Sequence, residues 1–171
     1  MKNKTGPRED EAPKHEAKGD PGTLVTVDER YAYRIYSGLN PAVRLIKMIE
    51  PDTPNDLYEV RLFNAVNERV CEWRFTERTA DGYYLILSQT EKLLALGEAT
   101  NDTAIVSPLT RRPAQYWRLI DAGSGYYYFE NKYDNWVLDV EGGNSGERTR
   151  IITYPRRGGA NQKFKLARIG A

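Results

Sequence analysis

Short runs of alternating apolar and polar residues dominate the chain from about residue 30 onward. In three of these runs an aromatic residue and a second large apolar residue stand two positions apart, at 33–35, 84–86 and 127–129. Because successive side chains of a strand point to opposite faces, each pair would lie on one face of a strand. Turn-forming clusters of Gly, Pro, Asn and Asp separate the runs, and no segment has a helical stripe with capping residues at both ends. The pattern predicts an all-β protein, either a sandwich or a barrel.

The strands are predicted to repeat three times. About ten residues after each aromatic pair comes an apolar pair, at Val43 to Leu45, Leu93-Leu94 and Val137-Leu138. Each copy then closes on an aromatic residue, and these closing residues (Trp73, Trp117 and Phe164) are 44 and 47 residues apart. Units of this length, with four strands each, predict a pseudo-threefold barrel capped by hairpins. The repeats would cover about 30–78, 79–122 and 123–169.

The closing tripeptides are predicted to serve the fold. Their aromatic residues would form one layer of the core, because large apolar side chains in equivalent positions of a symmetric barrel meet at its centre. Gln115 and Gln162 each stand two positions before the closing aromatic residue, whereas Cys71 takes that place in the first copy. A small buried thiol is the expected state of Cys71, since no histidine is available in the folded part to activate it.

The first 27 residues are predicted to form a disordered, charged tail in front of a domain at 28–171. Residues 1 to 22 contain three prolines, three glycines and many charges, with no aromatic residue and no Ile or Val. Such a segment cannot bury enough apolar surface to offset the loss of chain entropy. Leu24 to Val27 is β-prone, so it is either a lead-in strand or the end of the tail. His15, the only histidine, lies in the tail.

The charge balance, the cysteine count and the N-terminal sequence indicate where the protein is located and which partners it binds. The 25 basic and 24 acidic residues nearly cancel, which disfavours nucleic acid and membrane surfaces as partners. A single cysteine allows no intramolecular disulfide. The N-terminus lacks the apolar core of a signal peptide, and no apolar run approaches the roughly 20 residues of a membrane span. We therefore expect a soluble, cytoplasmic protein without membrane insertion, with unconventional export left open.

The closing motifs carry a family resemblance. The threefold Gln-x-Trp-like closure, preceded in the third copy by Asn161, resembles the ricin-type β-trefoil lectins. The resemblance covers about residues 30 to 169 and is closest in the third copy, where 137–140, 151–155 and 161–164 match a complete sugar-binding repeat. It implies a β-trefoil of three four-stranded repeats and a carbohydrate-binding function, with galactose or GalNAc as the expected sugar type.

The candidate site lies in the third copy. Sugar recognition needs fixed acceptors and donors for adjacent hydroxyls, plus a flat apolar surface for the C–H face of the ring. Asp139 would accept from two hydroxyls, Asn161 would donate to one, and Tyr154 would stack on the sugar. The resemblance further implies that Gln162 supports the pocket from behind and that the pocket is lined by Val140, Glu141, Gly142 and Ile152. The alternative is that Asp139 only caps a turn and that Tyr154 is an exposed strand residue.

The other two copies lack this set of residues. In the second copy Ala95 is assigned to the Asp139 position, Ser107 to the Tyr154 position and Ala114 to the Asn161 position. In the first copy the assigned residues are Lys47 or Met48, Phe63 and Val70, in the same order. One site per chain predicts affinity in the roughly millimolar range, about −4 kcal/mol. Useful avidity would then require a homodimer or fusion to a partner.

Catalysis finds little support in the sequence. The only histidine lies in the tail, and no His/Cys cluster has metal-ligand spacing, so we expect no enzyme, no metal and no cofactor. The alternative function is that of a β-trefoil protease inhibitor or protein-docking module, which would use the proline-containing segment 50–57. A third class, a binder of anionic polymers, is suggested by the doublets Arg111-Arg112 and Arg156-Arg157.

Overall fold

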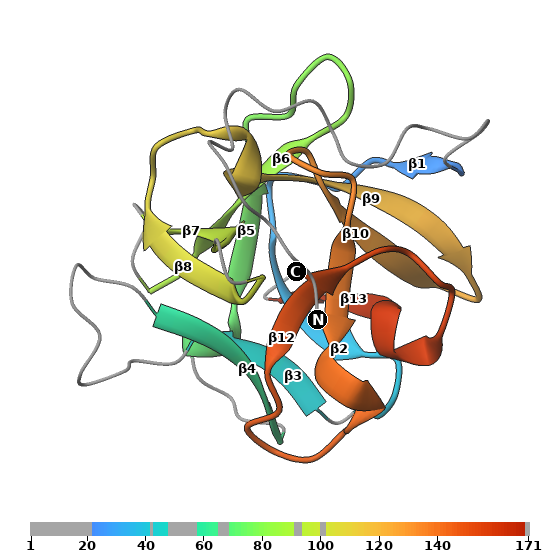
Figure 1. The fold of residues 1–171 in the computed structure, drawn as a ribbon. Helices are drawn as coiled ribbons and strands as arrows, with labels where there is room; N and C mark the ends of the chain where they lie inside the picture. Colours follow the sequence, from blue (N-terminus) through green and yellow to red (C-terminus); the bar gives the residue numbers. More distant parts are fainter. Residues whose placement is uncertain are drawn as a thin grey trace.

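The computed structural model describes residues 22–41, 43–47, 58–64, 69–90, 94–99 and 102–169. Within these ranges every regular element is a strand or a single turn of 3-10 helix (Figure 1). The strands are β1 (Leu24–Val25), β2 (Ala32–Ser37), β3 (Val43–Lys47), β4 (Tyr58–Asn64), β5 (Trp73–Thr76), β6 (Tyr84–Ser88), β7 (Leu94–Glu98), β8 (Ala104–Pro108), β9 (Tyr116–Gly123), β10 (Tyr126–Asn131), β11 (Val137–Val140), β12 (Ile151–Tyr154) and β13 (Phe164–Ile169). The 3-10 turns are η1 (Arg69–Cys71), η2 (Pro113–Gln115), η3 (Glu141–Gly143) and η4 (Ala160–Gln162).

Six strands close into a barrel. The antiparallel pairs run β2–β5, β5–β6, β6–β9, β9–β10, β10–β13 and back from β13 to β2. These six are the first and fourth strands of the three repeats. Closure pairs the backbone groups that an open sheet would leave at its two edges.

Three hairpins cap one end of the barrel. They are β3–β4, β7–β8 and β11–β12, the second and third strands of each repeat. The hairpins also contact one another, because β4 pairs with β8 and single bridges join Arg61 to Arg150 and Thr103 to Ile152. A closed six-stranded barrel with three capping hairpins is a β-trefoil. The predicted fold class and its pseudo-threefold symmetry are therefore confirmed.

The three closing aromatic residues are buried in the core, as predicted. Trp73, Trp117 and Phe164 are fully buried, and the Phe164 ring meets Phe129 edge to face with centroids 5.7 Å apart. The Trp117 indole N–H donates to the carbonyl oxygen of Leu96 at 2.9 Å, which satisfies its polar atom inside the core. Cys71 is fully buried and forms no disulfide, as predicted.

The segment before residue 28 is partly folded. β1 pairs with β9, with Leu24 opposite Ile120 and Val25 opposite Leu119. Val27 is buried, and its N–H donates to the Tyr84 hydroxyl at 2.9 Å. Of the two alternatives for residues 24–27, the structure shows the lead-in strand, so the folded part begins before residue 28. Residues 1–21, with His15, lie outside the described ranges, as does the segment 50–57.

No helix in the described ranges is long and apolar enough to cross a membrane.

Gly38 allows the first repeat to pack closely against η4, the turn that carries the candidate amides of the third repeat. Its N–H donates to the carbonyl oxygen of Lys163 at 2.7 Å. A Cβ at position 38 would lie 2.7 Å from that oxygen and 3.0 Å from the carbonyl oxygen of Ala160. Both atoms belong to the backbone and cannot rotate away.

Gly38→Ala is therefore expected to lower the free energy of unfolding by about 1–3 kcal/mol, the usual cost of overpacking. Urea denaturation followed by Trp fluorescence measures it. Gly146→Ala is the control, because a Cβ there would meet the side chain of Asn144, which can move. An unchanged midpoint for Gly38→Ala would contradict the close packing.

Candidate functional site

The third hairpin places Asp139 on the outer face of a buried strand. All four residues of β11 are buried, and the alternation of the strand turns Leu138 and Val140 into the core. Asp139 points the opposite way, toward η4, and is 5% exposed. Asp139 is paired across the hairpin with Ile152.

Two amide side chains of η4 hold the Asp139 carboxylate. Asn161 Nδ2 donates to Asp139 Oδ1 at 3.1 Å, and Gln162 Nε2 donates to Asp139 Oδ2 at 2.9 Å. A buried carboxylate needs such donors to offset the loss of hydration. A carboxylate can accept about four hydrogen bonds, and these two hold the Asp139 group in one orientation.

Gln162 fixes the turn that precedes η4. Its Oε1 accepts from the backbone N–H groups of Arg157 at 2.7 Å and Gly158 at 3.2 Å. Its Nε2 donates to the carbonyl oxygen of Pro155 at 2.9 Å in addition to Asp139. Gln162 is almost fully buried, so one side chain links the end of β12, the turn and the carboxylate.

A shallow pocket of about 360 Å³, the third-repeat pocket, opens in front of these groups. It is lined by six of the predicted site residues and by two that were not predicted: Asp139, Gly142, Ile152, Tyr154, Asn161 and Gln162, and then Arg157 and Gly159. Gly142 has a φ of +67°, a conformation that glycine adopts without strain. The basic doublet was visible in the sequence, but only the course of the turn after β12 shows that Arg157 lines the pocket.

Two predicted lining residues lie elsewhere. The Val140 side chain is fully buried in the core, because the alternation that turns Asp139 toward η4 turns Val140 inward. Val140 meets the site only through its carbonyl oxygen, 3.4 Å from Asn161 Nδ2. Glu141 turns toward Arg150, whose Nη1 lies 3.0 Å from Glu141 Oε2. Neither side chain is among those that line the pocket in the described part of the chain.

Tyr154 is half-buried between two neighbours. The Trp136 ring lies beside it with a centroid distance of 6.3 Å and an interplanar angle of 43°. The Arg157 guanidinium carbon lies 5.2 Å from the centroid of the Tyr154 ring. Such a distance is typical of a cation–π contact, so a cationic group contacts the one aromatic ring of this pocket.

The second repeat keeps the turn but not the pocket groups. Gln115 Oε1 accepts from the N–H groups of Thr110 and Arg111, and its Nε2 donates to Pro108 O at 3.0 Å and to Ser107 Oγ at 3.2 Å. The bond to Pro108 matches that from Gln162 to Pro155. This match fixes the alignment of the two repeats and confirms that Ser107 takes the place of Tyr154 and Ala114 that of Asn161.

The assignment of Ala95 to the Asp139 position was wrong. Tyr154 faces Val137 across its hairpin and Ser107 faces Ala95, so Gly97 is the counterpart of Asp139. The apolar pair of the second copy is therefore Ala95-Leu96. A shift of two residues keeps the strand alternation unchanged, which is why the sequence pattern alone did not reveal it.

The first repeat needs the same correction. Phe63 faces Arg44 across β3–β4, which places Ile46 at the Asp139 position. Lys47 and Met48 were wrong by one and two residues, and Met48 lies outside the described ranges. The other two assignments hold. Phe63 follows Leu62, which faces Leu45 as Thr153 faces Leu138. Val70 lies in η1 as Asn161 lies in η4. Neither earlier repeat has a carboxylate at this position.

Comparison with solved structures supports the β-trefoil class defined by the barrel and its hairpins. The designed three-fold symmetric protein ThreeFoil is 26% identical and covers 80% of this chain and 97% of its own, with a TM-score of 0.69. The C-half of an earthworm R-type lectin, crystallised with GalNAc, is 20% identical over 81% of this chain and 98% of its own, with a TM-score of 0.61. A mosquitocidal holotoxin is 16% identical over 85% of this chain, with a TM-score of 0.76, and the match spans only 18% of the toxin.

A family model describes the sequence more specifically. The model of ricin-type beta-trefoil lectin domain-like proteins matches residues 70–154 and, in an overlapping second match, residues 114–170. Together these matches cover more than half of the 171 residues. The chain belongs to this family of ricin-type β-trefoil lectin-like domains. A search of curated protein sequences gave no match.

Proposed function

We propose that the protein is a carbohydrate-binding domain that recognises a galactose-type sugar at the third-repeat pocket and has no catalytic role. One observation carries the proposal: Asp139, Asn161 and Tyr154 line one pocket, and Asp139 is held by two amide donors. In the described part of the chain, neither of the other repeats has this set of residues.

The polar groups provide the hydrogen bonds that a saccharide requires. The Asp139 carboxylate would accept from two adjacent hydroxyls of the sugar, which gives charge-assisted bonds. Asn161 Nδ2 lies 3.4 Å from the Val140 carbonyl oxygen, which is long for a hydrogen bond. A sugar hydroxyl at normal distance would be a better acceptor for that N–H. Because Gln162 and the backbone hold these groups in place, little ordering would be needed on binding.

Tyr154 provides the apolar surface for the sugar ring. The Arg157 guanidinium now contacts this ring, so a pyranose that stacks there would displace the guanidinium. The lost cation–π contact costs about 0.5–1 kcal/mol at an exposed site. This cost is small beside the hydrogen bonds gained, and the displaced Arg157 side chain would remain at the rim of the pocket.

The type of sugar is proposed from the resemblance of the third repeat to sugar-binding repeats. The earthworm lectin that shares this fold was crystallised with GalNAc. With one site per chain, we expect binding in the roughly millimolar range, about −4 kcal/mol. A dimer, or fusion to another domain, would be needed for tighter attachment to a glycan-covered surface.

A glycan array with the full chain, followed by calorimetry with the sugars that bind, tests the proposal. Wild-type protein is expected to bind glycans with terminal galactose or GalNAc in preference to those with terminal glucose or mannose. If no saccharide binds, the carbohydrate function is wrong. If only mannose- or glucose-type glycans bind, the protein binds carbohydrate but the proposed galactose-type specificity is wrong.

Asn161→Ala is expected to weaken galactose binding about tenfold. The variant removes one donor to the sugar and one amide that orients Asp139, and a single hydrogen bond contributes about 1–1.5 kcal/mol. Calorimetric titration measures the change. Ala114→Gly, at the equivalent position of the second repeat, is the control and should bind as wild type does. Equal affinities of Asn161→Ala and wild type would place the sugar elsewhere.

A further inference from the structure

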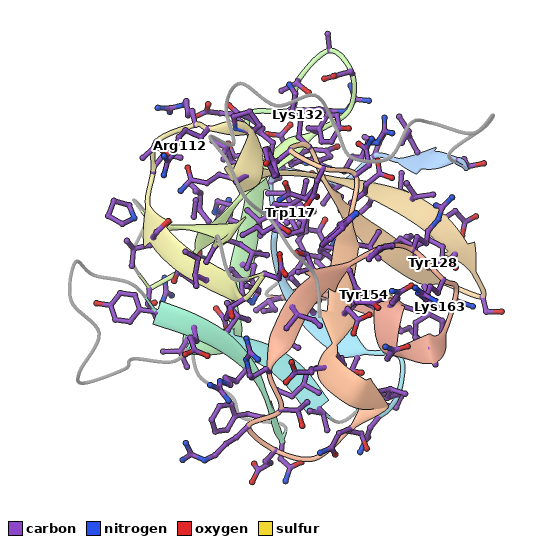
Figure 2. The ribbon with its side chains drawn as sticks, in the orientation of Figure 1. Arg112, Trp117, Tyr128, Lys132, Tyr154 and Lys163 are labelled. Carbon is purple, nitrogen blue, oxygen red and sulfur yellow. The ribbon has the colours of Figure 1, made fainter. Side chains whose placement is uncertain are left out.

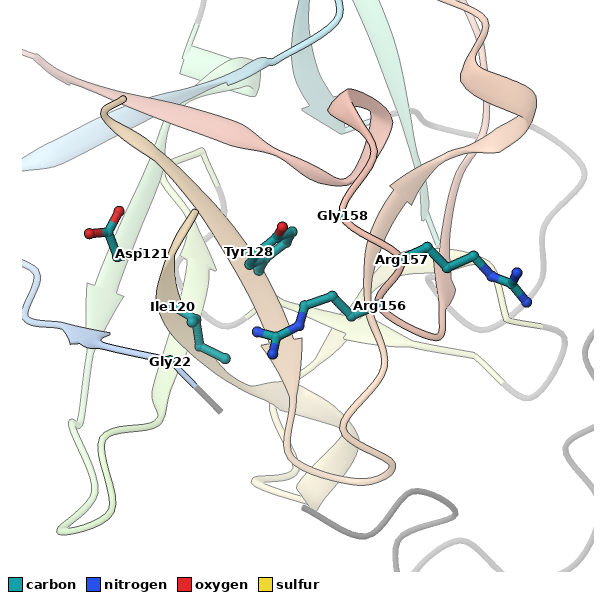
Figure 3. Close-up of a pocket in the computed structure, with 7 residues that line it drawn as sticks. All are labelled: Gly22, Ile120, Asp121, Tyr128, Arg156, Arg157 and Gly158. Carbon is teal, nitrogen blue, oxygen red and sulfur yellow. The ribbon is translucent and has the colours of Figure 1, made fainter. Parts of the chain in front are cut away.

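A second pocket of about 370 Å³, the flanking pocket, lies next to the third-repeat pocket. It is lined by Gly22, Ile120, Asp121, Tyr128, Arg156, Arg157 and Gly158 (Figure 3). Arg157 lines both pockets, and the next two residues of the chain, Gly158 and Gly159, line one each. The two pockets are therefore neighbours along a single turn.

The basic turn, residues 156–159, directs one arginine to each pocket. The Arg156 guanidinium carbon lies 4.9 Å from the centroid of the Tyr128 ring, and that of Arg157 lies 5.2 Å from the centroid of Tyr154. Figure 3 shows the two side chains pointing in opposite directions from adjacent backbone positions. Each cation is thus oriented by an aromatic ring at the wall of its pocket.

The described residues that line the flanking pocket include two arginines and one carboxylate. Asp121, which lies on the far side of Tyr128 from Arg157 in Figure 3, is the one carboxylate among the described lining residues, and its Oδ1 accepts from the N–H of Gly123 at 2.8 Å. The nearby Glu130 is buried and paired with Arg118 at 2.7 Å. Burial raises the pKa of Glu130, and the positive charges of Arg118 and Arg156 oppose this rise. Arg156 and Arg157 thus give the described lining more positive than negative side chains.

The other walls suit a sugar residue rather than a bare ion. Ile120 lies at the base of the pocket and is almost fully buried, so the half-buried ring of Tyr128 beside it offers the apolar surface. The Tyr128 hydroxyl lies next to the turn, 3.5 Å from where a Cβ of Gly158 would stand. An aromatic ring with its hydroxyl, a carboxylate and a guanidinium together offer partners for the C–H face, the hydroxyls and the acidic group of one sugar.

We propose that the flanking pocket binds a carboxylated or sulphated sugar residue that is attached to the galactose-type sugar held at Asp139. The proposal rests on the proposed lectin function, since the neutral sugar positions its acidic neighbour. Arg156 binds the carboxylate or sulphate, for which its planar fork of donors is suited. Arg157, once displaced from Tyr154 by the sugar ring, lies between the pockets and adds a second cation. The near-neutral charge of the whole chain favours this local recognition over binding to a long polyanion.

Calorimetry of the full chain with matched glycans tests the subsite. The probes are a neutral galactoside, the same galactoside carrying a terminal sialic acid, and the same galactoside carrying a sulphate. Wild type is expected to bind at least one acidic form about tenfold more tightly than the neutral form, because a hydrogen bond to a charged group contributes more than a neutral one. Whether the carboxylated or the sulphated probe is preferred identifies the acidic group.

Arg156→Ala is expected to remove this preference and leave the affinity for the neutral galactoside unchanged. Arg112→Ala is the matched control, because it removes the same charge from a part of the surface far from Tyr128 and Tyr154 in the view of Figure 2. The control should keep the preference. Arg156→Lys should restore only part of it, since an ammonium lacks the planar fork.

The possible failures can be told apart. If wild type binds the neutral galactoside but shows no preference for either acidic form, the subsite is wrong and the lectin function stands. The subsite is also wrong if Arg112→Ala loses as much of the preference as Arg156→Ala, because the effect is then one of net charge. If wild type binds none of the three probes, the proposed function itself fails.

Discussion

Asp139→Ala is expected to reduce galactose binding by at least a hundredfold, to below detection in a millimolar titration. The variant removes the acceptor for two sugar hydroxyls, and hydrogen bonds to charged groups contribute about 1.5–3 kcal/mol each. It also removes the group that orients both amides of η4. Calorimetry measures the binding, and retained affinity would show that the sugar lies elsewhere.

The same variant should keep its fold at a measurable cost. Gln162 Nε2 keeps the Pro155 carbonyl oxygen as its partner, so the turn is not left without hydrogen bonds. We expect a loss of about 1–3 kcal/mol in the free energy of unfolding, typical for a buried group that loses a partner. Circular dichroism and urea denaturation separate this loss from a failure to fold.

Asp139→Asn distinguishes charge from shape. An amide has nearly the same volume, but its NH₂ group would replace one of the two carboxylate oxygens. Either Gln162 Nε2 or Asn161 Nδ2 would then face another donor. Binding should fall nearly as far as in Asp139→Ala, and wild-type affinity in this variant would mean that the negative charge has no part in sugar recognition.

Trp117→Ala is expected to lower the free energy of unfolding by about 3–5 kcal/mol, the range for removal of a large aromatic side chain from a core. The side chain is fully buried, and its removal also leaves the Leu96 carbonyl oxygen without its indole donor. For a domain of this size such a loss is a large share of the total stability. Thermal and urea denaturation measure it.

Comparison with Phe164 shows whether the second and third repeats contribute equally. Phe164→Ala should cost about as much, since Phe164 is fully buried and packs edge to face on Phe129. Trp117→Phe should cost less than Trp117→Ala, because most of the apolar volume remains. If Trp117→Ala lowered the free energy of unfolding by less than about 1 kcal/mol, the closing aromatic residue of the second repeat would contribute little to stability.

The fold could be predicted because it depends on patterns that repeat. The alternation of Tyr33 with Ile35 and of Tyr84 with Ile86 defines an inward face, and the closing aromatic residues set the repeat length. Both the inward-facing residues and the closing aromatic residues are apolar because they are buried, and each repeat buries the equivalent positions. The lead-in strand was left open, because two residues such as Leu24 and Val25 are too few to show a period.

The candidate site could be predicted only in part. Asp139 and Asn161 stand at positions that match a known repeat, and the structure brings them together through hydrogen bonds. Val140 is buried because it is still part of strand β11, in which successive side chains alternate between the core and η4. The sequence did not show whether the strand ends before or after Val140, so its burial was not predicted. Arg157 and Gly159 line the pocket because of the course of one turn, which no periodic signal records.

The Ser107 hydroxyl holds the turn of the second repeat in the way that Asp139 holds the turn of the third. Gln115 Nε2 donates to Ser107 Oγ, whereas Gln162 Nε2 donates to the Asp139 carboxylate. The second repeat thus keeps its turn without a carboxylate partner for the glutamine. The second repeat therefore has the architecture of the third without its carboxylate, tyrosine and second amide. We expect the number of sugar sites in this fold to vary repeat by repeat, because the contacts that shape a repeat do not require all the groups proposed to bind sugar.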